Sequence, residues 1–191
     1  MALLRLRDAT FAGGGVRVGP LTLDLDDGER MAMQAESAMK ARVVALMAAA
    51  IVKASSGRVL IGDYDPCVQS VACKRIAAFV PHQPFPLEER EFTRYVAYRA
   101  ALWRIEPKRA RVHAELLRRR LAGMHDAFLY PLIGALIGMP KLVVLERPQR
   151  AYAAQILAAC AGRTIFSTHA DAASAAAFSG TTVDTRGTGR A

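Results

Sequence analysis

The chain is poor in cysteine, and it lacks any long uninterrupted apolar run. Its 191 residues contain three cysteines, an odd and scattered set that makes neither a disulfide framework nor a zinc site. No stretch of about 18 uncharged apolar residues is present, so we expect no membrane-spanning helix. The apolar stretch at the N-terminus is too short for a signal peptide. Together these absences favour the reducing environment of the cytoplasm.

Acidic residues are also few. Seventeen Asp and Glu face 26 Lys and Arg, a net charge of +9 that suits nucleic acid, an anionic membrane surface or an acidic partner. The densest basic run, residues 104–120, falls on a predicted amphipathic helix. The apolar positions of that helix are Val112, Leu116, Leu117 and Leu121. Because no aromatic residue interrupts its 108–121 stretch to stack on bases, we expect a solvated surface and no nucleic-acid partner.

Hydrophobic residues make up 52% of the chain and charged residues 23%, as in an ordinary globular domain. Alternating segments predict an antiparallel sheet over about residues 3–34, and strands that alternate with helices follow, so the fold class is α/β. Segments 142–145 and 164–167 are predicted to be adjacent parallel core strands, since a helix crosses between them. The predicted organisation is one domain over 1–180, with a mostly helical insertion at about 87–125 and a flexible tail at 181–191.

Five segments carry recognisable landmarks in a fixed order. They are RMAMQ-AESAMKAR at 30–42, SSGRVLIG at 55–62, RIAAFVPH at 75–82, GMPKLVVLERP at 138–148 and AGRTIFSTH at 161–169. In order and spacing they resemble the ATP-binding subunit of ABC transporters over about residues 3–178. The resemblance implies a RecA-like P-loop NTPase core of ABC type, with an antiparallel N-terminal β-subdomain and a helical insertion.

The family's phosphate loop has the pattern Gly-x-x-x-x-Gly-Lys-Ser/Thr, in which backbone N–H groups cradle phosphates, the lysine reaches them and the hydroxyl holds Mg²⁺. Here Ala35 stands at the first glycine, Lys40 at the second, Ala41 at the lysine and Arg42 at the hydroxyl. A slip of one residue gives Lys40 the lysine's role but leaves Ala41 at the hydroxyl. The degenerate loop consists of Ala35, Glu36, Ser37, Ala38, Met39, Lys40, Ala41 and Arg42. We therefore expect no cofactor, and ATP with Mg²⁺ only if residual binding survives.

The other family positions also depart from the pattern. Glu146 keeps a carboxylate at the first Walker B position, whereas Arg147 replaces the carboxylate that would polarise the attacking water. His169 matches the switch histidine, and His82, with Gln83 beside it, stands at the glutamine-loop position. The signature position holds Ala122, Gly123, Met124, His125 and Asp126, without paired glycines.

Ordinary structural roles compete with each of these interpretations. Glu146 is a candidate for a local ion pair with Arg147 at the sheet edge. His169 is equally a structural histidine, and His125 a surface group. Lys40 and Arg42 fit ordinary charges at a helix start. The methionines predicted to fill the core are Met31, Met33, Met39 and Met47.

The joint loss of lysine, hydroxyl, carboxylate and glycines implies a non-catalytic pseudo-ATPase, a structural or regulatory member of a transport complex. Its expected partners are a permease, which would hold it at the inner face of a membrane, an intact ABC ATPase subunit, or a second copy in a dimer. Two alternatives stay open: the ATP-binding half of an asymmetric pair, and a basic module that binds nucleic acid or a membrane surface. The partner surface is expected at helically spaced residues of the insertion, namely Phe92, Tyr95, Tyr98, Leu102 and Trp103.

Overall fold

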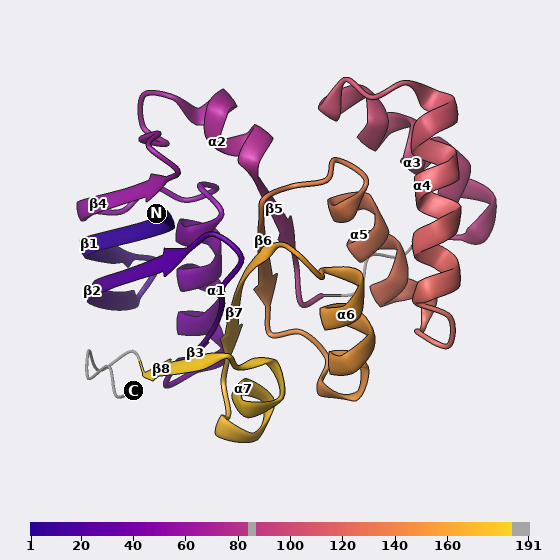
Figure 1. Ribbon diagram of the computed structural model, residues 1–191. Helices are drawn as coiled ribbons and strands as arrows, with labels where there is room; N and C mark the ends of the chain where they lie inside the picture. The colour runs from indigo at the N-terminus through magenta and orange to yellow at the C-terminus, as the bar shows by residue number, and fades with distance from the viewer. Residues whose placement is uncertain (84–86, 185–191) are drawn as a thin grey trace.

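The computed structural model describes residues 1–83 and 87–184, which form two sheets and the helices around them (Figure 1). An antiparallel sheet has the strand order β2-β1-β4, and a parallel sheet has the order β5-β6-β7-β3-β8. The strands are β1 (Ala2–Gly13), β2 (Val16–Asp26), β3 (Arg30–Gln34), β4 (Ser56–Ile61), β5 (Ala77–Val80), β6 (Leu142–Glu146), β7 (Thr164–His169) and β8 (Thr181–Asp184).

The helices cover both faces of the parallel sheet. Helix α1 packs against strands of both sheets, and α3 with α4 forms an outer layer on the side away from the antiparallel sheet (Figure 1). None of the described helices combines the length and the hydrophobicity that a bilayer crossing requires. The helices are α1 (Ala38–Ala48), α2 (Ser70–Ile76), α3 (Glu89–Trp103), α4 (Pro107–Arg120), α5 (Asp126–Leu136), α6 (Ala153–Ala159) and α7 (Ala172–Phe178), with a 3₁₀ turn at Arg150–Tyr152.

Two hydrophobic clusters form the core. One lies between the parallel sheet and helices α3 to α7, and the other between that sheet, α1 and the antiparallel sheet. Every residue of β6 and β7 is buried, as expected for parallel strands covered on both faces. Met31, Met33 and Met47 lie in this core, but the prediction for Met39 is wrong, because its side chain is 54% exposed on the first turn of α1.

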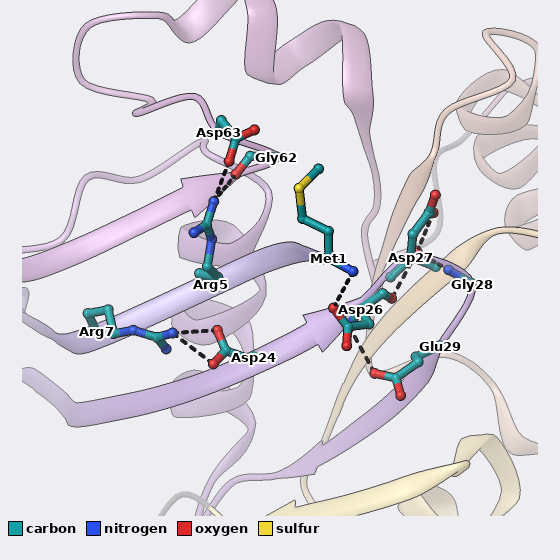
Figure 2. A network of polar contacts seen from close by, with 11 residues as sticks. Met1, Arg5, Arg7, Asp24, Asp26, Asp27, Gly28, Glu29, Gly62 and Asp63 are labelled. Carbon is teal, nitrogen blue, oxygen red and sulfur yellow. Dashed lines mark hydrogen bonds and ion pairs between the residues drawn. The ribbon is translucent and has the colours of Figure 1, made fainter.

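Ion pairs near the surface join β1 to β2 and to the turn after β4 (Figure 2). The guanidinium of Arg5 lies 2.6 Å from the Asp63 carboxylate, and that of Arg7 lies 2.7 Å from Asp24. Because water surrounds such pairs, they contribute little to stability. The sheet is held by the buried apolar residues of its inner face.

The predicted pair of parallel core strands is confirmed, since Leu142 lies opposite Thr164 in β6 and β7. The predicted extent of the antiparallel sheet is wrong at its end. Strand β3 belongs to the parallel sheet, between β7 and β8, and β4 completes the antiparallel sheet. Both changes depend on pairing between strands that are distant in sequence, which local hydrophobic alternation does not specify.

The C-terminal prediction also needs correction. Thr181–Asp184 form β8, parallel to β3, so these residues are not a flexible tail. Residues 185–191 of the predicted tail lie outside the described part of the chain.

The buried face of α4 differs from the predicted one. Val112 and Leu116 are 63% and 51% exposed, whereas the small Ala110 and Ala114 face the core. Leu117 and Leu121 are buried as predicted, so the buried stripe of α4 is rotated from the predicted one and shares these two residues with it.

Gly138 offers a direct check of how α3 seats against α5. A Cβ at this position would lie 2.0 Å from the Trp103 ring. We predict that Gly138→Ala lowers the free energy of unfolding by about 1–3 kcal/mol, since overpacking forces the ring to move. Trp103 is the single tryptophan, so its emission should shift to the red. Gly13→Ala is the control, since only the tip of the Phe11 side chain lies near, at 3.1 Å. An unchanged Gly138→Ala protein would refute this packing.

Candidate functional site

The candidate site lies at the C-terminal ends of β3, β6 and β7, where α1 begins. The strand register places Gln34 beside His169, and Glu146 beside Thr168. The Ala35 N–H donates to the carbonyl of His169 at 2.8 Å, which fixes the turn after β3 to the end of β7. This edge of a parallel sheet is where open α/β folds bind their ligands.

The turn from β3 into α1 is short. Helix α1 begins at Ala38, so residues 38–42 of the degenerate loop already lie within it. Ser37 caps the helix, because its hydroxyl accepts from the Lys40 N–H at 3.2 Å. Only residues 35–37 remain outside the helix, and they form a turn rather than a loop that wraps around phosphates.

Both basic side chains of this loop are engaged by carboxylates. The Lys40 ammonium lies 2.5 Å from a carboxylate oxygen of Glu36, one turn earlier. The Arg42 guanidinium lies 3.6 Å from the Oε1 of Glu146 at the end of β6. The positive charge that sequence analysis placed near a phosphate is thus neutralised within the chain.

The Glu146 carboxylate is buried, with 1% of its side chain exposed. Its Oε2 accepts from the His82 N–H at 3.4 Å, and its Oε1 has no hydrogen-bond partner in the described part of the chain. The predicted ion pair with Arg147 at an exposed sheet edge is wrong, because the cation that faces Glu146 is Arg42. At the end of β6 the site therefore has one carboxylate, and it is already paired with Arg42.

Arg147 begins the turn after β6 in a left-handed backbone conformation, with φ +41°. Its N–H donates to the carbonyl of Thr168 at 2.8 Å, and its own carbonyl lies 2.8 Å from the Nδ1 of His82. Arg147 and His82 line a cleft of about 510 Å³ together with His169 and Asp171. Arg147, whose guanidinium cannot accept a proton, lines this cleft at the position where the sequence resemblance expects a catalytic carboxylate.

His169 is buried and neutral at neutral pH. Its Nε2 lies 2.9 Å from the Ser167 hydroxyl, whereas its Nδ1 has no hydrogen-bond partner among the described residues. Burial lowers the pKa of His169 to about 4, and the nearby Asp171 carboxylate offsets only part of this effect. The neutral ring can accept or donate a hydrogen bond but carries no charge toward a phosphate.

The signature position lies between α4 and α5, and its Met124 reaches the edge of this cluster. Gly123 takes a left-handed conformation between α4 and α5, and the His125 side chain accepts from the Ala127 N–H at 3.3 Å as the N-cap of α5. His125 is exposed, as predicted for a surface group, and Asp126 occupies the first turn of the helix. Met124 lines an apolar pocket of about 380 Å³ beside His82, Glu146 and Arg147. The exposed Gln83 lines neither this pocket nor the cleft.

Two residues near the cluster were missed by sequence analysis. The buried Thr168 hydroxyl has no hydrogen-bond partner in the described residues, and Asp171 caps α7 by accepting from the Ser174 N–H at 2.7 Å. That hydrogen bond lowers the pKa of Asp171. The sequence signal that could have indicated them is their position within two residues of His169, at the end of a predicted strand.

The residues at the metal position do not fit Mg²⁺. This ion requires oxygen ligands in octahedral geometry. The group that faces Glu146 here is the Arg42 guanidinium, a cation without a lone pair to donate. Within residues 1–83 and 87–184 no cluster of His, Cys, Asp and Glu side chains is suited to a metal ion. We therefore derive no chemistry through Mg²⁺.

The low pKa of His169 predicts how stability depends on pH. Between its ordinary pKa of 6.5 and about 4, the unfolded chain binds a proton that the folded chain does not. Stability should therefore fall as the pH drops through this window, by roughly 3 kcal/mol for this residue. Urea unfolding at several pH values measures the loss, and His169→Gln should remove that share of it. An NMR titration of His169 near pH 6.5 would contradict the prediction.

Comparisons with known proteins support the fold alone. No protein-family model matches the sequence, and no curated protein does. An ATP-binding subunit of an ABC transporter aligns with a TM-score of 0.76 and 18% identity, over 95% of this chain and 85% of that one. The cbiO1 protein of Clostridium perfringens, part of the ABC transporter complex cbiONQ, aligns with a TM-score of 0.67 and 14% identity. This alignment covers 89% of this chain and 79% of that one. The cassette MJ0796, dimeric and bound to ADP and Pi, aligns with a TM-score of 0.72 and 15% identity. This alignment covers 95% of this chain and 93% of that one. The chain thus has the fold of ABC transporter ATP-binding cassettes, with a RecA-like core.

Proposed function

We propose that the chain is a non-catalytic subunit of ATP-binding-cassette type, which keeps the fold to hold a transport complex together and hydrolyses no ATP itself. One observation carries the proposal: both cations of the phosphate loop are neutralised within the chain, Lys40 by Glu36 and Arg42 by Glu146. Phosphoryl transfer depends on free positive charge and on N–H donors aimed at the developing negative charge.

The short turn after β3 supports the same conclusion. A phosphate cradle is made of consecutive backbone N–H groups in a loop of non-helical conformation. Here helix α1 begins at Ala38, and the Lys40 and Ala41 N–H groups are bonded to the side chain and the carbonyl of Ser37. These donors would have to leave their acceptors before they could bind a phosphate.

The groups around the attacking water supply the second line of support. Arg147 places a guanidinium where a base would act, and the buried His169 carries no charge at neutral pH. A water in the cleft would therefore meet no carboxylate at the position that orients it. Of the cleft residues, only Asp171 is acidic, and its carboxylate accepts the Ser174 N–H.

The alternative of an asymmetric ATPase pair receives less support. To assist a partner's site, residues 122–126 would present N–H groups to its phosphate. The Asp126 carboxylate stands in the first turn of α5, where an anion already benefits from the positive end of the helix dipole. A second anion brought there would be repelled.

The third alternative rests on the basic face of α4. Arg118 pairs with Glu89, and Arg119 with Glu115, so part of that charge is neutralised on the surface. No described feature of α4 favours nucleic acid over solvent.

A groove between α2, β5 and α3 supports a permease as the partner. Its volume is about 1170 Å³, and its apolar floor and rim include Ile51, Val71 and Leu102, which are 53%, 64% and 58% exposed. The charged residues that line it are all basic: Lys74, Arg75, Arg99 and Arg104. Such a surface complements an acidic amphipathic helix, and we assign it to a cytoplasmic helix of a permease, which would hold the chain at the membrane.

The five residues expected at the partner surface divide between two roles. Phe92 is buried and stacks on Tyr130 with ring centroids 4.6 Å apart, and Tyr95 is half-buried. Leu102 and the half-buried Trp103 line the groove, and Tyr98 is 59% exposed. The partner surface is therefore narrower than the predicted set of five.

The known assemblies of similar folds agree with a partnered subunit. The cbiO1 protein is part of a transporter complex, and MJ0796 is dimeric. This chain carries the same fold, and we extend their assembled state to it as part of the proposal.

The proposal predicts catalytic silence. Phosphate release by the purified chain should stay at background, and so should that of Arg147→Glu alone. A chain with residues 35–42 rebuilt to Gly-Glu-Ser-Gly-Met-Gly-Lys-Ser should also stay silent, because the catalytic roles act as a unit. Activity is expected only when both changes are combined, and Glu146→Ala in that background should abolish it. Wild-type turnover near the common median of ~10 s⁻¹ would overturn the proposal.

The groove is tested by the introduction of a negative charge. Leu102→Glu should reduce recovery of a permease, identified by mass spectrometry in detergent extracts, by about tenfold or more, since it places an anion opposite an acidic helix. Val112→Glu is the matched control, because Val112 is 63% exposed on α4 and does not line the groove. Failure to recover a permease, or equal effects of both substitutions, would contradict the assignment.

A further inference from the structure

The contact between Arg42 and Glu146 joins two elements at the position where the family's fold holds its metal. Arg42 comes from the first half of α1, and Glu146 is the last residue of β6. Their charged groups lie 3.6 Å apart, with the Arg42 side chain 41% exposed and that of Glu146 1% exposed. The guanidinium thus closes the solvent side of a buried carboxylate.

We propose that the Arg42 guanidinium is a built-in cation that takes the place of the metal ion between α1 and β6. The loop after β3 then needs neither metal nor nucleotide to hold α1 against the end of the sheet. This inference goes beyond the proposed function, because it concerns how the fold is fixed and holds whichever partner the chain binds.

The first step of the argument is the cost of burying a carboxylate. A charge removed from water is strongly unfavourable unless an opposite charge or several hydrogen bonds compensate it. The only hydrogen bond to the Glu146 carboxylate among the described residues is the 3.4 Å contact from the backbone N–H of His82, which is long for this type of bond. Arg42 therefore supplies most of the compensation.

The second step is that no other nearby cation can take over this role. Lys40, two residues before Arg42, is held by Glu36 at 2.5 Å. Arg147, the next residue after Glu146, forms no ion pair with it in the described part of the chain, and the Arg147 backbone is tied to Thr168 and His82. Arg42 is thus the cation that the structure pairs with this carboxylate.

The third step is the difference between a guanidinium and a metal. A bound Mg²⁺ is present only when its concentration and its nucleotide ligand allow, whereas a guanidinium is covalently attached and stays charged at every physiological pH. A divalent cation approaching Glu146 would also meet a like charge at close range. The Arg42 side chain would therefore exclude the metal while it performs the metal's structural task.

A double-mutant cycle measured by thermal unfolding tests the proposal with the full chain. Arg42→Gln in EDTA should lower the Tm by about 6 °C or more, because removal of one partner leaves a buried charge uncompensated. Arg42→Lys should lower the Tm by less, since lysine keeps a positive charge at this position. The Arg42→Gln/Glu146→Gln protein should recover at least half of the lost Tm, because both charges are gone.

Magnesium chloride alone is the second arm of this experiment. The wild-type Tm should be the same in EDTA and in excess MgCl₂. Arg42→Thr, which places a hydroxyl beside Glu146, should gain Tm in MgCl₂, and Arg42→Thr/Glu146→Gln should not. The proposal is overturned if Arg42→Gln unfolds at the wild-type Tm, if the Tm of Arg42→Thr is the same in MgCl₂ and in EDTA, or if MgCl₂ raises the Tm of the wild type. ATP hydrolysis by the wild type would refute the proposed function and leave this cycle unaffected.

Discussion

A carboxylate buried at the end of an interior strand must be neutralised, and this requirement organises the site. Glu146 lies at the C-terminal end of β6 with its side chain almost fully buried, and the Arg42 guanidinium faces it from α1. The Ala35 N–H bonds the end of β7 at the same edge, so α1, β3, β6 and β7 are joined at one place. The position that a metal would need is thereby part of the structural framework.

If the proposed function holds, the same arrangement explains how a cassette fold can persist without ATP hydrolysis. Its core consists of two clusters of apolar residues around the parallel sheet and α1, and neither cluster requires a ligand. Cations at the loop are satisfied by Glu36 and Glu146. Under the proposed function, selection on such a chain would act on the groove and on the core, which would be enough for a subunit that binds partners.

Much of the fold was predictable, because the strongest signals are local. Residues 142–145 and 164–167 are short apolar runs, and a strand covered on both faces has that composition. Strand β8 gave no such signal, because Thr181–Asp184 contain a single large apolar residue. The places of β3 and β4 in their sheets depend on distant partners, and the buried face of α4 uses Ala110 and Ala114, whose small side chains weaken the hydrophobic pattern.

The site positions were predicted from order and spacing, and the structure brings loop 35–42, His82, Glu146, Arg147 and His169 to one edge of the sheet. What sequence could not supply was the pairing of charges. Glu146 and Arg147 are neighbours in the chain, but successive residues at a strand end point to different sides, so the partner of Glu146 came from α1.

Calorimetric titration of the purified chain with ATP, in MgCl₂ and in EDTA, tests the central claim most directly. Binding that is absent, or equally weak in both solutions, is the predicted result. Micromolar binding that requires Mg²⁺ would contradict the account.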